Sequence, residues 1–261
     1  MRSYAFAAAY WTLSVFYALA ATFLALLPGR KPVTWAIRRY SRRMLQAMRH
    51  LAGIKVEVKG AERLPAGAFI IAAKHHSWGD GFVMFANVKN LSFVTGDHLE
   101  RIPLLSGILK KLGAIVVDNC GGPEARKALS DSAAAAHAEG KRILIYPEGH
   151  LAKPGEHFRY RSGVWHMYAD FDLPVVPVAT NLGLFWEQVS FEKKPGTATI
   201  EFLDVIPTGL PKAEFLARLE AVIEGRTQEL IAEATGEPVK PSVLVPFPGE
   251  EERKAEAGVA A

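Results

Sequence analysis

Short apolar runs alternate with helical segments along most of this chain, and this alternation restricts the fold more than any other feature. Strands are expected at 54–59, 68–73, 91–95, 114–117, 142–146, 173–180 and 198–205. Helices are expected at 82–88, 102–112, 123–139, 164–169 and 212–234. Strands that alternate with helices form a parallel sheet with helices on both faces. The sequence therefore predicts an α/β fold with a mixed, largely parallel sheet flanked by helices.

An apolar segment precedes this domain. Residues 5–27 hold 23 positions without a charged side chain, and as a helix they would measure about 34 Å at ~1.5 Å per residue. The first half gathers aromatic residues, as at a membrane interface, namely Tyr4, Tyr10, Trp11 and Tyr17. A signal peptide is the alternative, but its charged start would hold only Arg2 and its apolar part would be too long. We expect a membrane-anchoring helical segment, either a full span or a helix pair that dips into one leaflet.

A basic stretch follows the apolar segment. Residues 29–63 contain ten Lys or Arg and two Glu, and such a flank tends to stay in the cytoplasm. The prediction is therefore an inner (cytoplasmic) membrane protein whose catalytic domain faces the cytoplasm. In this stretch arginines occupy the other faces of a helix on which apolar residues recur at helical spacing. These apolar residues are Ile37, Tyr40, Met44, Met48 and Leu51. They predict a basic amphipathic helix on anionic lipid, and the alternative is a helix packed on the domain with solvated arginines.

These patterns divide the chain into three regions. Residues 1–51 are expected to form the anchor and the basic helix, and residues 52–236 the catalytic domain. Residues 237–261 form a Pro-rich, charged tail that we expect to be disordered. The formal net charge of +4 suits an anionic membrane or an acidic carrier protein, and no nucleic-acid-binding motif is present. The single cysteine, Cys120, excludes an intramolecular disulfide.

Two predicted strands end in residues suited to chemistry. The first leads into Lys74-His75-His76-Ser77-Trp78-Gly79-Asp80, and the second into Pro147-Glu148-Gly149. Imidazole takes a proton near neutral pH, and a carboxylate against its other nitrogen fixes the tautomer and stabilises the imidazolium. We interpret His75 as a general base and Asp80 as its orienting acid. The alternative is a core histidine bonded to Asp80 for stability; no metal is predicted, because the spacing matches no zinc signature.

With both segments in place, the chain resembles the lysophosphatidic acid acyltransferases, the bacterial 1-acyl-sn-glycerol-3-phosphate acyltransferase branch of the glycerolipid acyltransferase family. The resemblance covers roughly residues 50 to 225 and rests on four blocks in order, at 74–80, 93–118, 146–149 and 173–179. It implies that His75 deprotonates the free hydroxyl of a lysolipid, which then attacks the thioester of acyl-CoA or an acyl carrier protein. It implies no cofactor beyond this donor substrate and no acyl-enzyme. Gly-x-Ser-x-Gly, the nucleophile elbow of the alternative design, is absent from the sequence.

The chain departs from the family where a phosphate group would bind. Gly96, Asn119 and Leu151 stand at positions that are usually basic in the family, and leucine cannot imitate the bidentate fork of arginine. The resemblance implies a substrate-binding set with possible substitutes for these cations, namely Glu148, Gly149, His150, Arg161, Lys110 and Lys111. Backbone N–H groups at the helix start after His75 are expected to stabilise the oxyanion.

Three other functions stay open at this point. The acceptor head group could differ, as in a lyso-ornithine lipid or a lysophospholipid. The lost basic positions also fit a catalytically weak, membrane-tethered protein that binds lipid or carrier. A secreted esterase would require cleavage near residue 28.

Overall fold

A seven-stranded sheet forms the centre of the protein in a computed structural model, which describes residues 1–100, 102, 105–117 and 123–248. The strand order is β1-β8-β7-β2-β5-β3-β4, and of the paired strands only β7 and β8 are antiparallel. The strands are β1 (Ile54–Lys59), β2 (Ile70–Ala73), β3 (Leu91–Gly96), β4 (Ile115–Val117), β5 (Arg142–Ile145), β7 (Val175–Thr180) and β8 (Gly196–Phe202). The predicted α/β class with a largely parallel sheet is confirmed.

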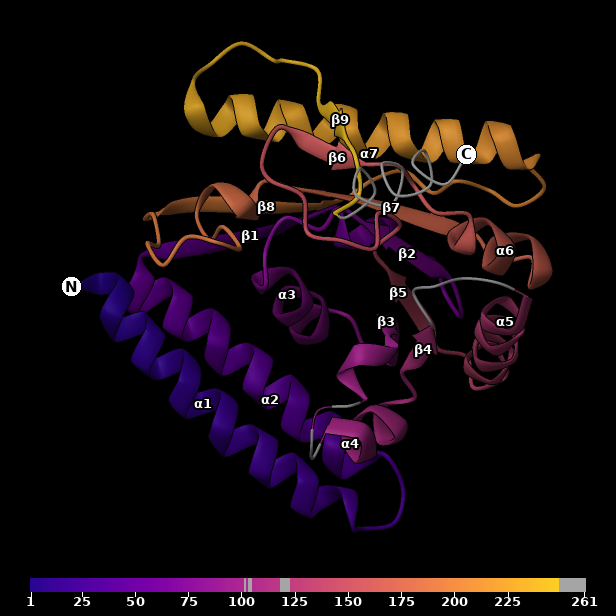
Figure 1. The fold of residues 1–261 in the computed structure, drawn as a ribbon, viewed down its shortest axis with the longest axis horizontal. Coiled ribbons are helices and arrows are strands. Elements are labelled where there is room, and N and C mark those ends of the chain that lie inside the picture. The colour runs from indigo at the N-terminus through magenta and orange to yellow at the C-terminus, as the bar shows by residue number, and fades with distance from the viewer. Residues whose placement is uncertain (101, 103–104, 118–122, 249–261) are drawn as a thin grey trace, which may run out of the picture.

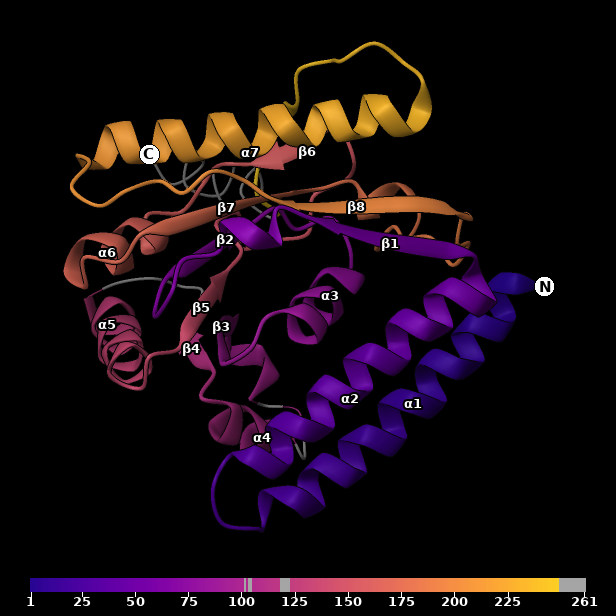
Figure 2. The same ribbon diagram turned by 180° about the vertical axis from the view of Figure 1, so that it is seen from behind.

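Helices cover both faces of this sheet (Figures 1 and 2). The helices of the domain are α3 (Gly79–Asn87), α4 (Leu105–Leu112), α5 (Pro123–Ala138), α6 (Gly163–Asp170) and α7 (Lys212–Thr235). Side chains of the buried β2 alternate between two cores: Ile71 and Ala73 join the core on the α3 side, and Ile70 and Ala72 the core against α6 and α7. Burial on both faces explains why the central strands are apolar without alternation.

The N-terminal segment folds into a helical hairpin that packs on the domain. It comprises α1 (Arg2–Ala25), α2 (Lys31–Ala47) and a short π-helix (Met48–Ala52). The two long helices run side by side (Figure 1), joined by the stacked rings of Tyr17 and Tyr40 and by a 2.7 Å hydrogen bond between the hydroxyl groups of Ser14 and Tyr40. By length and composition α1 is long and apolar enough to cross a membrane, and only 11% of its apolar window is buried.

The expected amphipathic helix on lipid is corrected by this packing. Met44 and Met48 are fully buried in the core that α1 and α3 also line. Arg38 turns toward the domain, where its guanidinium donates to the backbone carbonyls of Val88 (3.0 Å) and Ala86 (3.3 Å). The apolar face of α2 is therefore covered by protein, and the alternative of a helix packed on the domain holds.

The tail expectation is wrong for part of its length. Residues 243–245 form β9 (Val243–Val245), which pairs in parallel with β6 (Glu156–Phe158) as a separate two-stranded sheet. Both strands were missed, the first inside the expected disordered tail and the second inside an expected loop over 150–160. Three residues are too few for periodicity to reveal a strand, and the partner lies about 90 residues away in the sequence. Residues 249–261 lie outside the described residues.

Candidate active site

The ends of β2 and β5 bring the two polar motifs together. These strands are parallel neighbours in which Ala72 pairs with Ile145, so His75 and Glu148 each follow three residues later. In an open α/β sheet the carboxyl ends of parallel strands meet at one edge, where ligands bind. A 2.9 Å hydrogen bond from the Ala152 N–H to the His75 carbonyl ties the second motif to the first.

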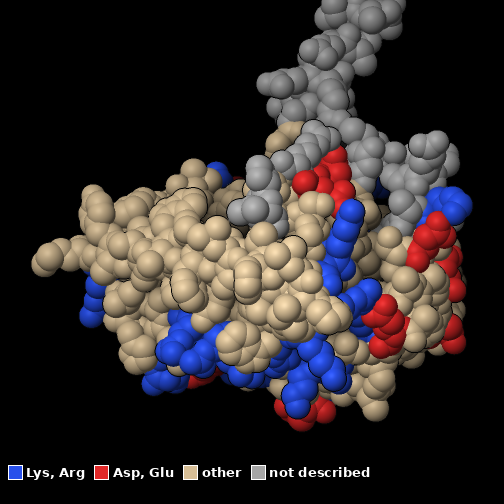
Figure 3. Space-filling model, turned by 90° about the horizontal axis from the view of Figure 1, so that it is seen from below, with Lys and Arg blue, Asp and Glu red and all other residues tan. Residues whose placement is uncertain are grey.

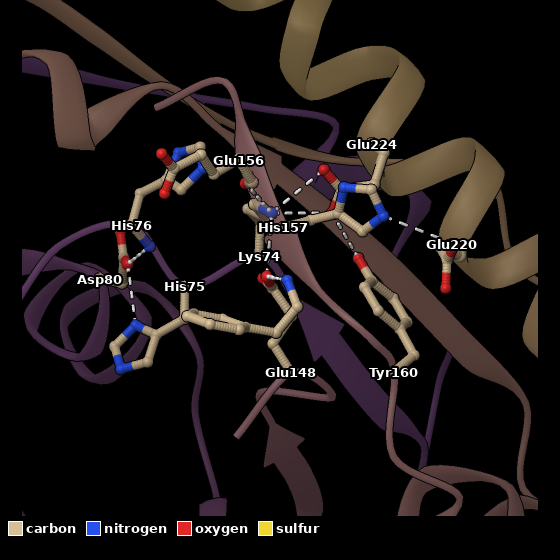
Figure 4. A network of polar contacts seen from close by, with 11 residues as sticks. Lys74, His75, His76, Asp80, Glu148, Glu156, His157, Tyr160, Glu220 and Glu224 are labelled. Carbon is tan, nitrogen blue, oxygen red and sulfur yellow. Dashed lines mark hydrogen bonds and ion pairs between the residues drawn. The ribbon is translucent and has the colours of Figure 1, made fainter. Parts of the chain in front are cut away.

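His75 and Asp80 form a hydrogen-bonded pair, as expected. The His75 Nδ1 lies 3.1 Å from Asp80 Oδ2, and the side chains are 18% and 2% exposed (Figure 4). Asp80 Oδ2 also accepts the N–H groups of His76 and Ser77, both at 2.8 Å, which fixes the carboxylate across the turn that opens α3. Because a carboxylate only accepts, Nδ1 carries the proton in neutral His75 and Nε2 is left as a basic nitrogen. The pair has the geometry of an oriented general base.

Tyr146 is a site residue that sequence reasoning missed. Its ring stacks on that of His75, with centroids 3.9 Å apart and an angle of 14° between planes. Burial and the nearby charge of Asp80 raise the pKa of the Tyr146 phenol well above its ordinary value, so this group stays neutral. The Tyr146 ring therefore packs against the His75 imidazole and restricts its rotation. An aromatic residue directly after β5 was the available signal.

The expected oxyanion donors at the start of α3 are already engaged. The N–H groups of His76 and Ser77 bind Asp80, the Gly79 N–H donates to Ser77 Oγ at 3.0 Å, and the Asp80 N–H to the Ser77 carbonyl at 3.2 Å. These four groups stabilise the turn and cannot also bind an oxyanion. The expectation is corrected for them, and it was wrong because a carboxylate in the first turn competes for the same N–H groups.

A buried ion cluster lies behind the His75 loop (Figure 4). The Lys74 ammonium donates to Glu148 Oε2 at 3.1 Å, to Glu224 Oε1 at 2.9 Å and to the Glu156 carbonyl at 2.9 Å. The Tyr160 hydroxyl donates to Glu224 Oε1 at 2.9 Å. The cluster therefore joins the carboxyl ends of β2 and β5 to α7 from the far side of the sheet.

Glu148 belongs to this cluster rather than to an open binding surface. Its side chain is fully buried and accepts the N–H of Phe158 at 2.8 Å as well as Lys74. Burial, reinforced by the charge of Glu224, raises the pKa of Glu148 to about 7, although Lys74 opposes the shift. The prediction that this carboxylate contacts substrate is corrected, because no substrate reaches a fully buried side chain in this arrangement.

Glu224 was not singled out from the sequence, although a signal existed. Its neighbours on the inner face of α7, Phe215, Leu219 and Ile223, are fully buried. A carboxylate at the edge of such an apolar stripe is costly unless a cation meets it. A residue of this kind indicates a buried partner, but only the tertiary structure identifies that partner as Lys74.

Gly149, His150 and Arg161 meet beside the His75 loop. Gly149 has φ of +70°, and a Cβ there would lie 3.0 Å from Arg161 Nε, so both the turn and the close approach require glycine. The Arg161 N–H donates to the Pro147 carbonyl at 2.8 Å, and its Nη2 donates to His150 Nε2 at 3.2 Å. Burial and the charge of Arg161 lower the pKa of His150, which keeps this imidazole a neutral acceptor. Three of the six predicted substrate-binding residues therefore form one group.

Lys110 and Lys111 lie elsewhere. They end α4, where Lys111 Nζ donates to the carbonyls of Leu27 (2.8 Å) and Gly29 (3.3 Å) in the loop between α1 and α2. The two lysines line an apolar hollow with Thr22, Ala25, Leu26, Gly29, Arg30 and Gly107. The structure thus places them against the helical hairpin of α1 and α2 and does not group them with Arg161. Gly96 ends β3, and Asn119 and Cys120 fall outside the described residues.

His76 has no part in the open site. Its side chain is buried, and burial, followed by the charges of Lys74 and His75, lowers its pKa well below the ordinary value. The imidazole is therefore neutral. His75 is consequently the histidine of this motif that combines partial exposure with a carboxylate partner.

Comparisons with known proteins agree with this geometry. A family model for acyltransferases matches residues 55–181. The 1-acyl-sn-glycerol-3-phosphate acyltransferase of Pseudomonas aeruginosa is 28% identical over 223 residues, which is 85% of this chain and 86% of that protein. Human 1-acyl-sn-glycerol-3-phosphate acyltransferase beta is 24% identical over 182 residues, 67% of this chain and 65% of that protein.

A solved structure shares the fold. The crystal structure of the 1-acyl-sn-glycerophosphate acyltransferase PlsC from Thermotoga maritima superposes with a TM-score of 0.70 and 20% identity, over 88% of this chain and 95% of that one. The match extends beyond the residues covered by the family model, and the architecture described above is therefore that of a solved acyltransferase.

Proposed function

We propose that this chain, which belongs to the acyltransferase family, moves a fatty acyl group from a thioester donor to the free hydroxyl of a lysolipid, with His75 as the general base. The single observation that carries the assignment of the base is the His75–Asp80 pair at 3.1 Å, at the carboxyl end of a central strand. The donor is acyl-CoA or an acyl carrier protein, both of which present the same thioester.

The reaction follows from the orientation of the imidazole. His75 Nε2 accepts the proton of the lysolipid hydroxyl while the oxygen attacks the thioester carbonyl. The tetrahedral intermediate collapses, the C–S bond breaks, and the imidazolium returns the proton to the departing sulfur, which leaves as the free thiol. Asp80 stabilises that imidazolium through Nδ1–H, and Tyr146 keeps the ring in plane. General-base assistance of this kind contributes about 10²–10⁴ in rate.

The favoured acceptor is 1-acyl-sn-glycerol 3-phosphate, which would give phosphatidic acid. Support comes from the reaction for which the relatives are named and from the cation that Arg161 presents beside the His75 loop. Arginine binds phosphate through paired N–H groups, and Leu151 offers none. A lyso-ornithine lipid or another lysophospholipid stays an alternative acceptor, because Leu151 takes the place of a usually basic residue of the family.

In this proposal the membrane delivers the lysolipid acceptor to the site. Several large apolar side chains of α1 are exposed, namely Tyr4, Trp11, Val15, Phe16, Leu19 and Phe23. Figure 3 shows the face seen from below, a broad surface without charge that Lys and Arg side chains border. This face suits burial among acyl chains, with the cations at lipid phosphates. We place the protein on the inner membrane with the catalytic domain in the cytoplasm, because the basic flank follows α1.

A panel of lysolipids tests the proposal. The purified protein is assayed with each lysolipid and with either acyl-CoA or acyl carrier protein, and release of the free thiol is recorded. We expect His75→Ala to lower kcat by at least ~10²-fold with unchanged circular dichroism. His137→Ala, in an exposed position on α5, is the matched control and should retain full activity.

Two outcomes would reject the proposal in different ways. Full activity of the His75→Ala variant would remove the general base. Binding of lysolipid without any thiol release would instead support the catalytically weak binding protein.

A further inference from the structure

The C-terminal segment contacts the group formed by Gly149, His150 and Arg161, which is called here the candidate head-group site. Residues 237–248, called here the C-terminal strap, include β9, whose Val243 N–H donates to the Gly155 carbonyl at 2.8 Å. Two residues beyond β9, the ring of Phe247 stacks on Phe158 of β6, with centroids 5.6 Å apart and an angle of 8° between planes. Backbone pairing and ring stacking thus fix the strap on the loop that follows Glu148.

Phe247 also contacts the predicted head-group residues. Its ring lies 4.8 Å from Arg161 Cζ, in cation–π geometry, and its centroid is 5.4 Å from that of His150. Gly149 borders the same guanidinium closely enough that an added Cβ would meet Nε and Cζ at 3.0 and 3.3 Å. Arg161 is therefore held between a glycine backbone and an aromatic ring.

We propose that Phe247 is a positioning residue for acceptor recognition, whose ring holds the Arg161 guanidinium in the orientation that binds an anionic phosphate head group. The inference rests on the proposed lysolipid acyltransferase function and adds the residue that sets its head-group preference.

The physical reason lies in the shape of the guanidinium. Stacking uses the face of the group, whereas its N–H donors point outward in the plane. The Phe247 ring beneath Arg161 Cζ therefore restricts rotation of the guanidinium, and one of its N–H donors goes to His150 Nε2. The loop after Glu148 carries Leu151 in place of a cation, so in this proposal the cation comes from Arg161. A long side chain that reaches the site from outside this loop needs packing contacts to hold it in one orientation.

Three substitutions separate aromatic positioning from plain packing. Phe247→Leu keeps apolar volume but removes the π face, Phe247→Tyr keeps the face, and Phe247→Ala removes both. We expect Phe247→Leu and Phe247→Ala to raise the KM for 1-acylglycerol 3-phosphate about five-fold, which corresponds to about 1 kcal/mol. The kcat and the donor KM should not change, because the ring acts on Arg161 and His150 and not on the general base. Phe247→Tyr should stay within about two-fold of the wild type.

Activity with a neutral acceptor distinguishes positioning of Arg161 from a purely structural role of Phe247, because a structural role would affect both acceptors equally. The preference for 1-acylglycerol 3-phosphate over monoacylglycerol, as a ratio of kcat/KM, should fall in Phe247→Leu and hold in Phe247→Tyr. Leu244→Ala, an exposed position on the same strap, is the control and should leave the ratio unchanged. If Phe247→Leu matches the wild type, or if it impairs both acceptors equally, the inference is overturned.

Failure of the proposed function would look different. Absence of thiol release by the wild type with every acceptor would reject the acyltransferase proposal. Equilibrium binding of 1-acylglycerol 3-phosphate and of monoacylglycerol in detergent micelles still tests the strap in that case. Weaker binding of the phosphate-bearing lipid alone by Phe247→Leu would support the positioning role, and equal binding would refute it.

Discussion

The stability of the protein should depend on pH through Glu148. We expect the free energy of unfolding of the wild type to fall, relative to that of Glu148→Gln, as the pH rises from about 4.5 to 7. Burial raises the folded-state pKa of Glu148 from 4.5 to about 7, so the folded protein holds this proton more tightly than the unfolded chain. A raised pKa of this sign gives stability that is complete below the unfolded value and is lost as the pH passes through the folded value. Glutamine does not titrate and lacks this dependence.

The size of the effect follows from the same numbers. At about 1.36 kcal/mol per pKa unit, the shift of Glu148 corresponds to about 3 kcal/mol between pH 4.5 and pH 8. For a domain of this size, with a midpoint change of roughly 2–4 °C per kcal/mol, the thermal midpoints of the two proteins should diverge by about 6–12 °C.

Thermal unfolding in detergent, followed by circular dichroism across this pH range, measures the difference directly. Titrating groups outside the Lys74 cluster contribute equally to both proteins, so their effects cancel in the difference. Glu62→Gln, an exposed glutamate, should parallel the wild type. Curves of the wild type and Glu148→Gln that stay parallel from pH 4.5 to 8 would show that the Lys74 cluster holds Glu148 ionised, and the reasoning would fail.

Three further predictions concern the site and the anchor. Asp80→Asn should lower kcat at least ~10²-fold with little change in either KM, since an amide no longer fixes the His75 tautomer; steady-state kinetics at unchanged acceptor KM would show this, and a pure KM effect would contradict it. Gly149→Ala should cost about 1–2 kcal/mol in stability and raise the acceptor KM, because φ is +70° and the new Cβ would lie 3.0 Å from Arg161 Nε; unchanged thermal unfolding would count against it. The double change Phe16→Ser and Phe23→Ser should reduce vesicle flotation at least ~10-fold, because both side chains are exposed on α1, and full retention would remove this face from the membrane contact.

The sequence predicted the largely parallel sheet and the His75–Asp80 hydrogen bond because both depend on residues that are close together in the chain. Apolar runs of four to eight residues specify buried strands, and the alternation of strands with helices specifies parallel pairing. His75 and Asp80 lie five positions apart across one turn, so their pairing needs no information from the rest of the chain.

The misjudged residues depended on distant neighbours. Glu148 reads as a site residue beside Gly149, but Lys74, which lies 74 residues earlier in the sequence, binds its carboxylate in the interior together with that of Glu224. The apolar face of α2 reads as a lipid surface until α1 and α3 cover it. In each case the local pattern identified an unusual side chain, and the environment assigned its role.

The amino-acid sequence by itself determined the class of fold and the pairing of His75 with Asp80, since these follow from periodicity and short spacing. Only the tertiary structure decided which charges are buried, which lysines lie far from Arg161, and that a strap from the C-terminal end covers that arginine. The physical reason is that burial and ion pairing are properties of surroundings, and the surroundings of Glu148 and Arg161 are built by segments up to about 90 residues away along the chain.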